Sequence, residues 1–360
     1  MPPHQFVSRY RIFGNKQWHK VTESTLAQHL PVLYQDHPLG IYGEEDDLVL
    51  STLSQPSFVL FMLDLLQLKE GLRVLEVGAG SGWNAALMAK LVGPKGHVDS
   101  IEIIPELAVR ASKALSAVGI KNVNIIEGDG GDSYESVAPY DRAIFTAGSF
   151  DLPCSFYRQL KNDALLLMVI KTPGGGDTLS LLKKVEDHFE SIFSRPCGFV
   201  PLTGKYRLGG LDPISLQEVA EWRVLKEHEV FRQAFWWGGT GIDESNWRTA
   251  GIRSYLGITE DNFQIFKGTN EADDGQDVSY FGLWSEERES LVLVKSDEII
   301  AYGSLHAKER FMKVIYHWVD LGMPSSSSFN LKIYPIDKAL VSGTNEWITK
   351  RRESQFIWSL

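Results

Sequence analysis

The chain has 360 residues, of which 43% are hydrophobic and 23% charged, and a formal net charge of −10. This composition excludes disordered, collagen-like and low-complexity classes and predicts a soluble globular protein of about two domains. The acidic balance, without a run rich in Lys and Arg, argues against a nucleic-acid partner, and the lack of a long apolar stretch argues against a membrane span or a signal peptide, so the cytoplasm is the expected location.

Strand-length apolar runs alternate with segments of helical period from residue 56 to about residue 200, a pattern typical of βαβ units and a parallel sheet. Pro105 suits a first helical position, and Gly119 supplies a helix stop. We therefore expect an α/β fold of Rossmann-like type, with a doubly wound, mostly parallel sheet. The expected elements are helices at 57–67, 83–92 and 105–118, strands at 73–77, 97–103, 123–127, 142–146 and 165–170, and two antiparallel strands at 179–185 and 190–201.

Residues 205–360 differ in composition, because they hold eight of the ten tryptophans. Strands at 279–284, 291–294, 299–302 and 329–334 and a helix at 306–321 predict a smaller α+β domain. We expect residues 1–204 to form one domain, with a cap segment at 1–50 and a catalytic core at 51–204, and residues 205–360 to form the second. Substrate recognition is its expected role, with structural support as the alternative. Trp236 and Trp237 could grip a peptide or lie in the core.

The two cysteines, Cys154 and Cys197, have no second Cys or His at ligand spacing. This favours buried, reduced thiols over a zinc site or a disulfide framework. No metal site is predicted.

A glycine-rich turn at residues 75–82 (LEVGAGSG) carries the densest chemical signal, between a predicted strand and a predicted helix. Glycines let the backbone turn sharply and approach a ligand, and Glu102, 20 residues after Gly82, could accept ribose hydroxyls. Glu76, beside the turn, suits a ligand with an ammonium group rather than a phosphate, so S-adenosylmethionine is the predicted cofactor. Asp129, in a Gly-Asp-Gly tripeptide after the third strand, could accept a hydrogen bond from the adenine amino group. A turn with purely structural glycines is the alternative.

These residues resemble the protein-L-isoaspartate O-methyltransferases, a branch of the class I S-adenosylmethionine-dependent methyltransferases. Beside the glycine turn, segments of the family's pattern occur in the family's order and cover about residues 50–204. They are Thr52-Leu53-Ser54-Gln55-Pro56, then Gly128-Asp129-Gly130 followed by Ala138-Pro139-Tyr140-Asp141, and finally Val200-Pro201-Leu202-Thr203. The family's minimal form ends soon after this last segment, so residues 205–360 are an extension.

The resemblance implies a class I methyltransferase fold, S-adenosylmethionine as cofactor and S-adenosylhomocysteine as product. It makes Ser54 the active-site serine and places Thr52 and Ser54 at the substrate. An N-cap for the following helix is the alternative role of Ser54. The implied cofactor contacts are Glu76, Gly78, Gly80, Gly82, Glu102, Asp129, Gly130 and Thr203.

The amino-terminal segment departs from the family pattern. Residues 13–48, with Trp18 and the acidic run at 44–47, are longer than the family's pattern leads us to expect. They could wall a peptide site, although such a charge run is more often a solvated loop.

The predicted function is transfer of a methyl group from S-adenosylmethionine to the carboxylate of an L-isoaspartyl residue, which leads to protein repair. The expected partners are peptides or proteins that contain isoaspartate. Two alternatives stay open at this point. One is an aspartate O-methyltransferase that matures a dedicated peptide, and the other is a non-catalytic adaptor that keeps the fold and binds through the Trp-rich domain.

Overall fold

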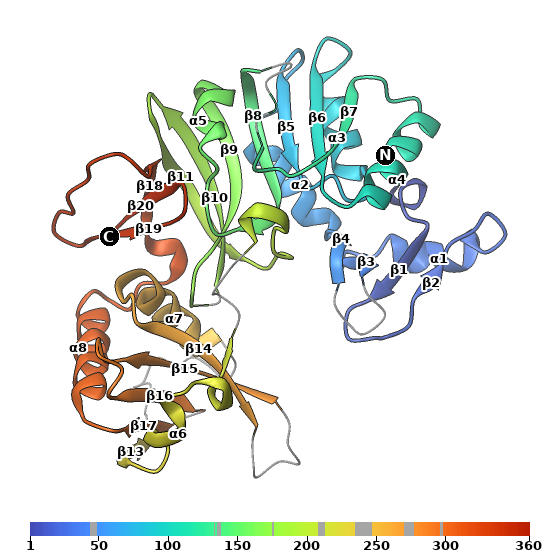
Figure 1. The fold of residues 1–360 in the computed structure, drawn as a ribbon. Coiled ribbons are helices and arrows are strands. Elements are labelled where there is room, and N and C mark those ends of the chain that lie inside the picture. The colour runs from blue at the N-terminus through green and yellow to red at the C-terminus, as the bar shows by residue number, and fades with distance from the viewer. Residues whose placement is uncertain are drawn as a thin grey trace.

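The computed structural model describes residues 1–43, 49–132, 134, 138–174, 176–207, 213–234, 247–269, 277–295 and 298–360. These residues form sheets of four, ten and six strands. Figure 1 shows the ten-stranded sheet in the upper part of the molecule, with the amino-terminal strands and the six-stranded sheet below it on opposite sides. The acidic run at 44–47 and the predicted Trp236-Trp237 surface lie outside the described residues.

The helices are α1 (Leu26–Leu33), α2 (Pro56–Leu65), α3 (Trp83–Val92), α4 (Pro105–Ala117), α5 (Ser155–Gln159), α6 (Trp222–Leu225), α7 (Trp247–Thr259) and α8 (His306–Asp320), with 3-10 turns η1 (Pro3–Gln5), η2 (Gly204–Tyr206), η3 (Leu216–Glu218) and η4 (Ser326–Ser328). The strands up to the end of the family-like segments are β1 (Arg9–Ile12), β2 (His19–Lys20), β3 (Leu39–Gly43), β4 (Val49–Leu53), β5 (Arg73–Val77), β6 (His97–Glu102), β7 (Val123–Glu127), β8 (Tyr140–Ser149), β9 (Leu160–Lys171), β10 (Asp177–Val185) and β11 (His188–Cys197). The later strands are β12 (Ile214–Ser215), β13 (Glu229–Ala234), β14 (Phe263–Thr269), β15 (Asp277–Trp284), β16 (Leu291–Lys295), β17 (Glu298–Tyr302), β18 (Asn330–Pro335), β19 (Glu346–Lys350) and β20 (Ser354–Ser359).

The ten-stranded sheet has the order β19-β20-β18-β11-β10-β9-β8-β5-β6-β7. Its strands from β7 to β9 are parallel, and the pairs from β9 to β19 are antiparallel. The predicted α/β fold class, with a further sheet domain in the carboxyl-terminal part, is confirmed. Strand β5 and helix α3 have the predicted bounds.

Both faces of this sheet are buried, as parallel strands require. Neighbouring residues of β5 point to opposite sides: Val74 joins a core with α2, α3 and the amino-terminal segment, whereas Leu75 joins a core with α5 and α8. Leu167 and Leu166 of β9 alternate in the same way. Many residues after 205 therefore belong to the same hydrophobic cluster as one face of the ten-stranded sheet.

The last three strands of the chain lengthen the catalytic sheet. Strand β18 pairs with β11, with Ile333 opposite Phe189, and β20 and β19 follow it at the edge. The domain boundary expected between residues 204 and 205 assigns these strands to the second domain. Whether the two parts fold as separate units stays a prediction. Among the other tryptophans of the extension, Trp284, Trp318 and Trp358 are buried, whereas Trp222 and Trp347 are half-buried.

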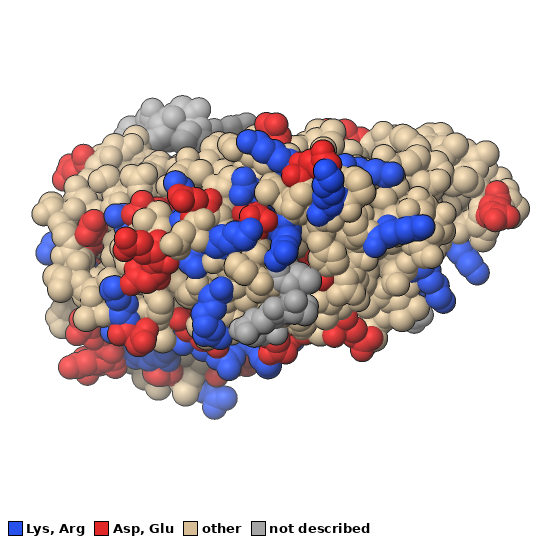
Figure 2. Space-filling model, turned by 90° about the horizontal axis from the view of Figure 1, so that it is seen from above, with Lys and Arg blue, Asp and Glu red and all other residues tan. Residues whose placement is uncertain are grey.

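Basic and acidic side chains are interspersed on the surface that Figure 2 shows from above. Away from this face, on β13, Arg232 lies between Glu229 and Glu298, with an N to O distance of 2.7 Å to each. Both cysteines are free thiols, but Cys154 is exposed and Cys197 half-buried, so the expectation of two buried thiols is wrong for Cys154. No helix among the described residues is long and apolar enough to cross a membrane.

Candidate active site

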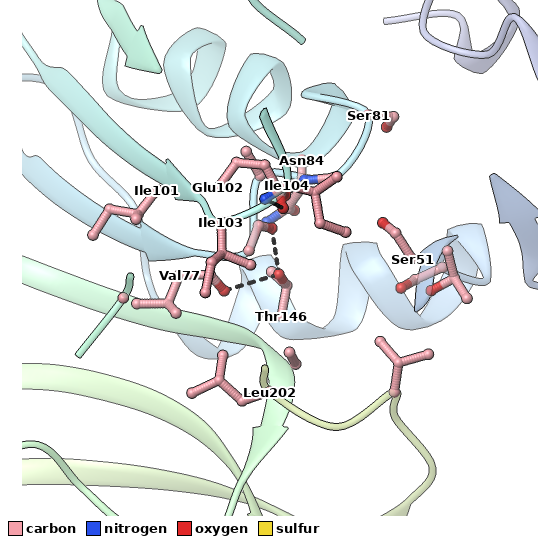
Figure 3. Close-up of a pocket in the computed structure, with 18 of the residues that line it drawn as sticks. Ser51, Val77, Ser81, Asn84, Ile101, Glu102, Ile103, Ile104, Thr146 and Leu202 are labelled. Atoms are coloured by element: carbon pink, nitrogen blue, oxygen red, sulfur yellow. Dashed lines mark hydrogen bonds between the residues drawn. The ribbon is translucent and has the colours of Figure 1, made fainter. Parts of the chain in front are cut away.

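A cleft opens where β5 and β6 end, beside Thr146 of β8, and the segments at 50–54 and 200–203 complete its wall. Figure 3 shows Ser51 on one side of it, Glu102 and Asn84 on the other, and Leu202 from the returning segment. Ligands of α/β sheets bind at this edge. The predicted site residues that line the cleft are Thr52, Ser54, Gly78, Gly80, Glu102, Gly130 and Thr203.

The glycine turn shapes the floor of the cleft. Gly78 and Gly80 have φ values of 99° and 55°, a region that favours glycine. A Cβ on Gly78 would lie 2.5 Å from Thr146 Oγ1, which donates hydrogen bonds to the carbonyl oxygens of Val77 (3.0 Å) and Gly78 (2.5 Å), as the dashed lines in Figure 3 mark. A side chain at this position would therefore displace the threonine and fill the floor.

Glu102 stands at the end of β6 with only 5% of its surface exposed. Its Oε2 accepts a hydrogen bond from the backbone N of Gly80 (2.7 Å), and its Oε1 accepts one from the backbone N of Ile104 (3.0 Å). Burial raises the pKa of this carboxyl. The two backbone donors hold the carboxylate in one orientation beside the turn.

Glu76 and Gly82 lie behind the lining of the cleft. Gly82 precedes α3 and packs against Ala111, so that a Cβ would lie 3.0 Å from that of Ala111. Glu76 is fully buried and accepts hydrogen bonds from Asn84 Nδ2 (2.7 Å) and Ser100 Oγ (2.5 Å). Burial raises the pKa of Glu76 to about 7. Asn84 itself lines the cleft, and its buried Oδ1 has no hydrogen-bond partner among the described residues.

Asp129 lies between two cleft-lining residues, Gly128 and Gly130, and its own carboxylate is turned to backbone groups. Its Oδ1 accepts a hydrogen bond from the N of Gly131 (2.8 Å), and its Oδ2 accepts one from the N of Lys205 (2.7 Å). The structure thus places Asp129 as a brace of the loop after β7. Its predicted contact with adenine stays a prediction.

Thr52 and Ser54 reach the cleft from the end of β4 and the short connection to α2. The alternative role of Ser54 as an N-cap is wrong, because Gln55 occupies the N-cap position. Asp36 caps this helix instead: its Oδ1 accepts a hydrogen bond from the N of Ser57 at 2.8 Å. Hydrogen bonds, with that from Gln55 the largest cause, lower the pKa of Asp36. The hydroxyl of Ser54 is therefore not needed to start α2.

A second groove continues from Thr52 and Ser54 between α2 and the segment after β11. A half-buried ion pair lies in its wall: Lys171 Nζ is 2.7 Å from both carboxylate oxygens of Asp177 and donates a hydrogen bond to the carbonyl oxygen of Phe199 at 3.0 Å. Asp177 Oδ2 accepts a hydrogen bond from the N of Phe199 at 2.9 Å. The pair fixes the segment that forms one side of both hollows.

The sequence analysis missed four polar residues of the lining, Ser51, Ser81, Asn84 and Thr146. Asn84 could have been found, because it is the second residue of the helix that the glycine turn starts, where a side chain can face back toward the turn. Thr146 is separated from the turn by 68 residues and gives no local signal. Within the described ranges, no three His, Cys, Asp or Glu side chains are grouped to hold a metal ion.

The parallel strands β7-β6-β5-β8-β9, with the cleft at the glycine turn after β5, define a class I methyltransferase fold. A family model described as protein-L-isoaspartate(D-aspartate) O-methyltransferase matches residues 19–207, which is just over half of the chain. The chain belongs to this family, as the sequence motifs predict.

Similar proteins from archaea carry the same family name. The protein-L-isoaspartate O-methyltransferase of Ignicoccus hospitalis is 40% identical over 169 residues, which are 47% of this chain and 77% of the relative. Protein-L-isoaspartate O-methyltransferase 1 of Archaeoglobus fulgidus is 44% identical over 176 residues, which are 48% of this chain and 76% of the relative. A solved protein-L-isoaspartate O-methyltransferase has a similar fold, with a TM-score of 0.54 and 21% identity over 92% of this chain and 88% of its own.

Proposed function

We propose that this chain transfers the methyl group of S-adenosylmethionine to the carboxylate of L-isoaspartyl residues in peptides and proteins, a reaction of protein repair. Membership of the family supports the activity. The observation that carries the proposal is the single cleft that brings together the glycine turn, Glu102 and the hydroxyls of Thr52 and Ser54. Cofactor and acceptor sites thus meet in one hollow.

The cleft fits the proposed cofactor in two respects. Gly78 and Gly80 have positive φ values that favour glycine, and both line the cleft, so the turn presents backbone without side chains to a ligand. Asn84 Oδ1 is a buried acceptor that lacks a donor, and an ammonium group supplies donors of this kind. Glu76, behind Asn84, adds negative charge when it is ionised. Glu102 offers carboxylate oxygens to ribose hydroxyls.

The chemistry asks little of the protein in proton transfer. An α-carboxylate has a pKa of roughly 3.5 and is already an anion at neutral pH. One carboxylate oxygen forms a bond to the methyl carbon, the bond from that carbon to sulfur breaks, and its electron pair goes to sulfur. A methyl ester and S-adenosylhomocysteine result. The chain must therefore place the carboxylate about 3 Å from the methyl carbon and in line with sulfur, and the hydroxyls of Thr52 and Ser54 are the donors at hand.

Calorimetric titration with S-adenosylhomocysteine tests the cofactor half of the proposal. Glu102→Ala should weaken binding by roughly 1.5 to 3 kcal/mol, because ribose hydroxyls lose a charged acceptor. Glu106→Ala, an exposed residue on α4 outside the lining, is the matched control and should bind like the wild type. Equal affinity of the Glu102 variant and the wild type would remove Glu102 from the site.

A further inference from the structure

The turn between β19 and β20 contacts the loop after β8, which is about 200 residues away in sequence. Asp151, in the loop after β8, is buried; its Oδ2 accepts a hydrogen bond from the N of Glu353 at 2.7 Å, and its Oδ1 accepts one from Ser354 Oγ. The N of Cys154 donates a hydrogen bond to Glu353 Oε2 at 2.9 Å. These contacts fix the turn on the loop that follows β8.

The same turn holds the 3-10 turn η2. Arg352 Nη1 donates a hydrogen bond to the carbonyl oxygen of Lys205 at 2.9 Å, and its guanidinium lies 5.7 Å from the ring centre of Tyr206. The Tyr206 hydroxyl also interacts with the Glu353 carboxylate. Arg352 and Glu353 thus contact two adjacent residues of η2, Lys205 and Tyr206.

The next contacts link η2 to the loop after β7. The N of Lys205 donates a hydrogen bond to Asp129 Oδ2 at 2.7 Å, and Lys205 Nζ pairs with Asp132. The ring of Tyr206 packs on Gly131 so closely that a Cβ there would lie 1.7 Å from Cε2. Gly128 and Gly130 on either side of Asp129 line the cleft, as does Thr203, just before η2.

We propose that Arg352 and Glu353 are positioning residues of the cofactor site, because they hold η2 and, through it, the Asp129 loop in the shape that binds the cofactor. Both residues lie beyond the segment that matches the family model, residues 19–207. The hairpin formed by β19 and β20 therefore helps to shape the cofactor site. This inference rests on the proposed function, since it concerns the same cleft.

The test uses the full chain and S-adenosylhomocysteine in calorimetry. Arg352→Ala/Glu353→Ala should raise Kd about fivefold, since lost hydrogen bonds of about 1 kcal/mol loosen the loop. Tyr206→Phe keeps the ring on Gly131 and removes only the hydroxyl, so it should raise Kd about twofold to threefold. Lys338→Ala is the matched control, because it breaks an exposed ion pair with Asp187 that lies away from the cleft lining.

Steady-state kinetics distinguish a specific effect on the cofactor site from a general loss of order in the protein. The KM for S-adenosylmethionine should rise with Kd in both variants, whereas the KM for an isoaspartyl peptide should stay within about twofold of the wild-type value. A Kd unchanged in Tyr206→Phe and in the double variant, or an equal rise of both KM values, would overturn the inference; if the double variant does not fold, Tyr206→Phe decides. A wild-type protein that does not bind S-adenosylhomocysteine would refute the proposed function together with this inference.

Discussion

Replacing Glu76 by Gln tests how the buried acid behind the cleft affects stability. Its pKa of about 7 in the folded chain lies above the ordinary value of 4.5. The folded state therefore binds more protons than the unfolded state between these two values, and the stability contributed by Glu76 falls as pH rises from about 4.5 to about 7. At about 1.36 kcal/mol per pKa unit, the loss is on the order of 3 kcal/mol.

Glu76→Gln removes this pH dependence and keeps the local hydrogen bonds, because its amide oxygen can accept from Asn84 and its amide nitrogen can donate to Ser100. In urea unfolding of the ligand-free protein, the variant should gain stability relative to the wild type by about 2.5 kcal/mol between pH 5 and pH 8. Glu106→Gln controls for the loss of one carboxylate. A stability difference between Glu76→Gln and wild type that stays constant over this range would refute the reasoning.

Three further predictions concern the acceptor side and the extension. Ser54→Ala should lower kcat at least about tenfold, because the acceptor carboxylate is held less well, and calorimetry should show unchanged S-adenosylhomocysteine affinity; an equal loss of both would contradict its assignment to the acceptor. Lys171→Met should raise the KM for an isoaspartyl peptide while cofactor affinity stays within about twofold, because Lys171 lies in the wall of the second groove, which continues from Thr52 and Ser54. Steady-state kinetics that show the reverse would exclude this groove as a peptide-binding surface. Truncation after Tyr206 should give insoluble protein without cofactor binding, because it removes strands β18–β20 and exposes the hydrophobic cluster that they share with the sheet. A soluble fragment that binds the cofactor would show that the extension is dispensable.

The catalytic sheet could be predicted because its signals are local. The glycine turn lies directly between β5 and α3, and Glu102 ends the next strand, so spacing along the chain was enough to predict their positions. The same holds for the family segments around Ser54 and Thr203. The parallel strands could be recognised as short apolar runs because both of their faces are buried.

The remaining features depend on contacts between distant residues. Asp36 caps α2 from another segment, which removes the capping role from Ser54. Strand β18 finds β11 across about 140 residues, a pairing that no short-range pattern can indicate. Glu76 is predicted as a cofactor contact from its place beside the turn, yet its side chain points behind the lining, to Asn84. Sequence spacing gives the position of a residue along a strand but not which partner its side chain reaches.

Methylation of a matched pair of peptides tests the central claim most directly. The two peptides have one sequence, with L-isoaspartate in one and L-aspartate in the other, and mass spectrometry after incubation with S-adenosylmethionine and the full chain measures methyl ester formation. We predict methylation of the isoaspartyl peptide and none above background for the aspartyl peptide. Ester on the aspartyl peptide alone, or on neither peptide under conditions in which the protein binds S-adenosylhomocysteine, would contradict the proposed activity.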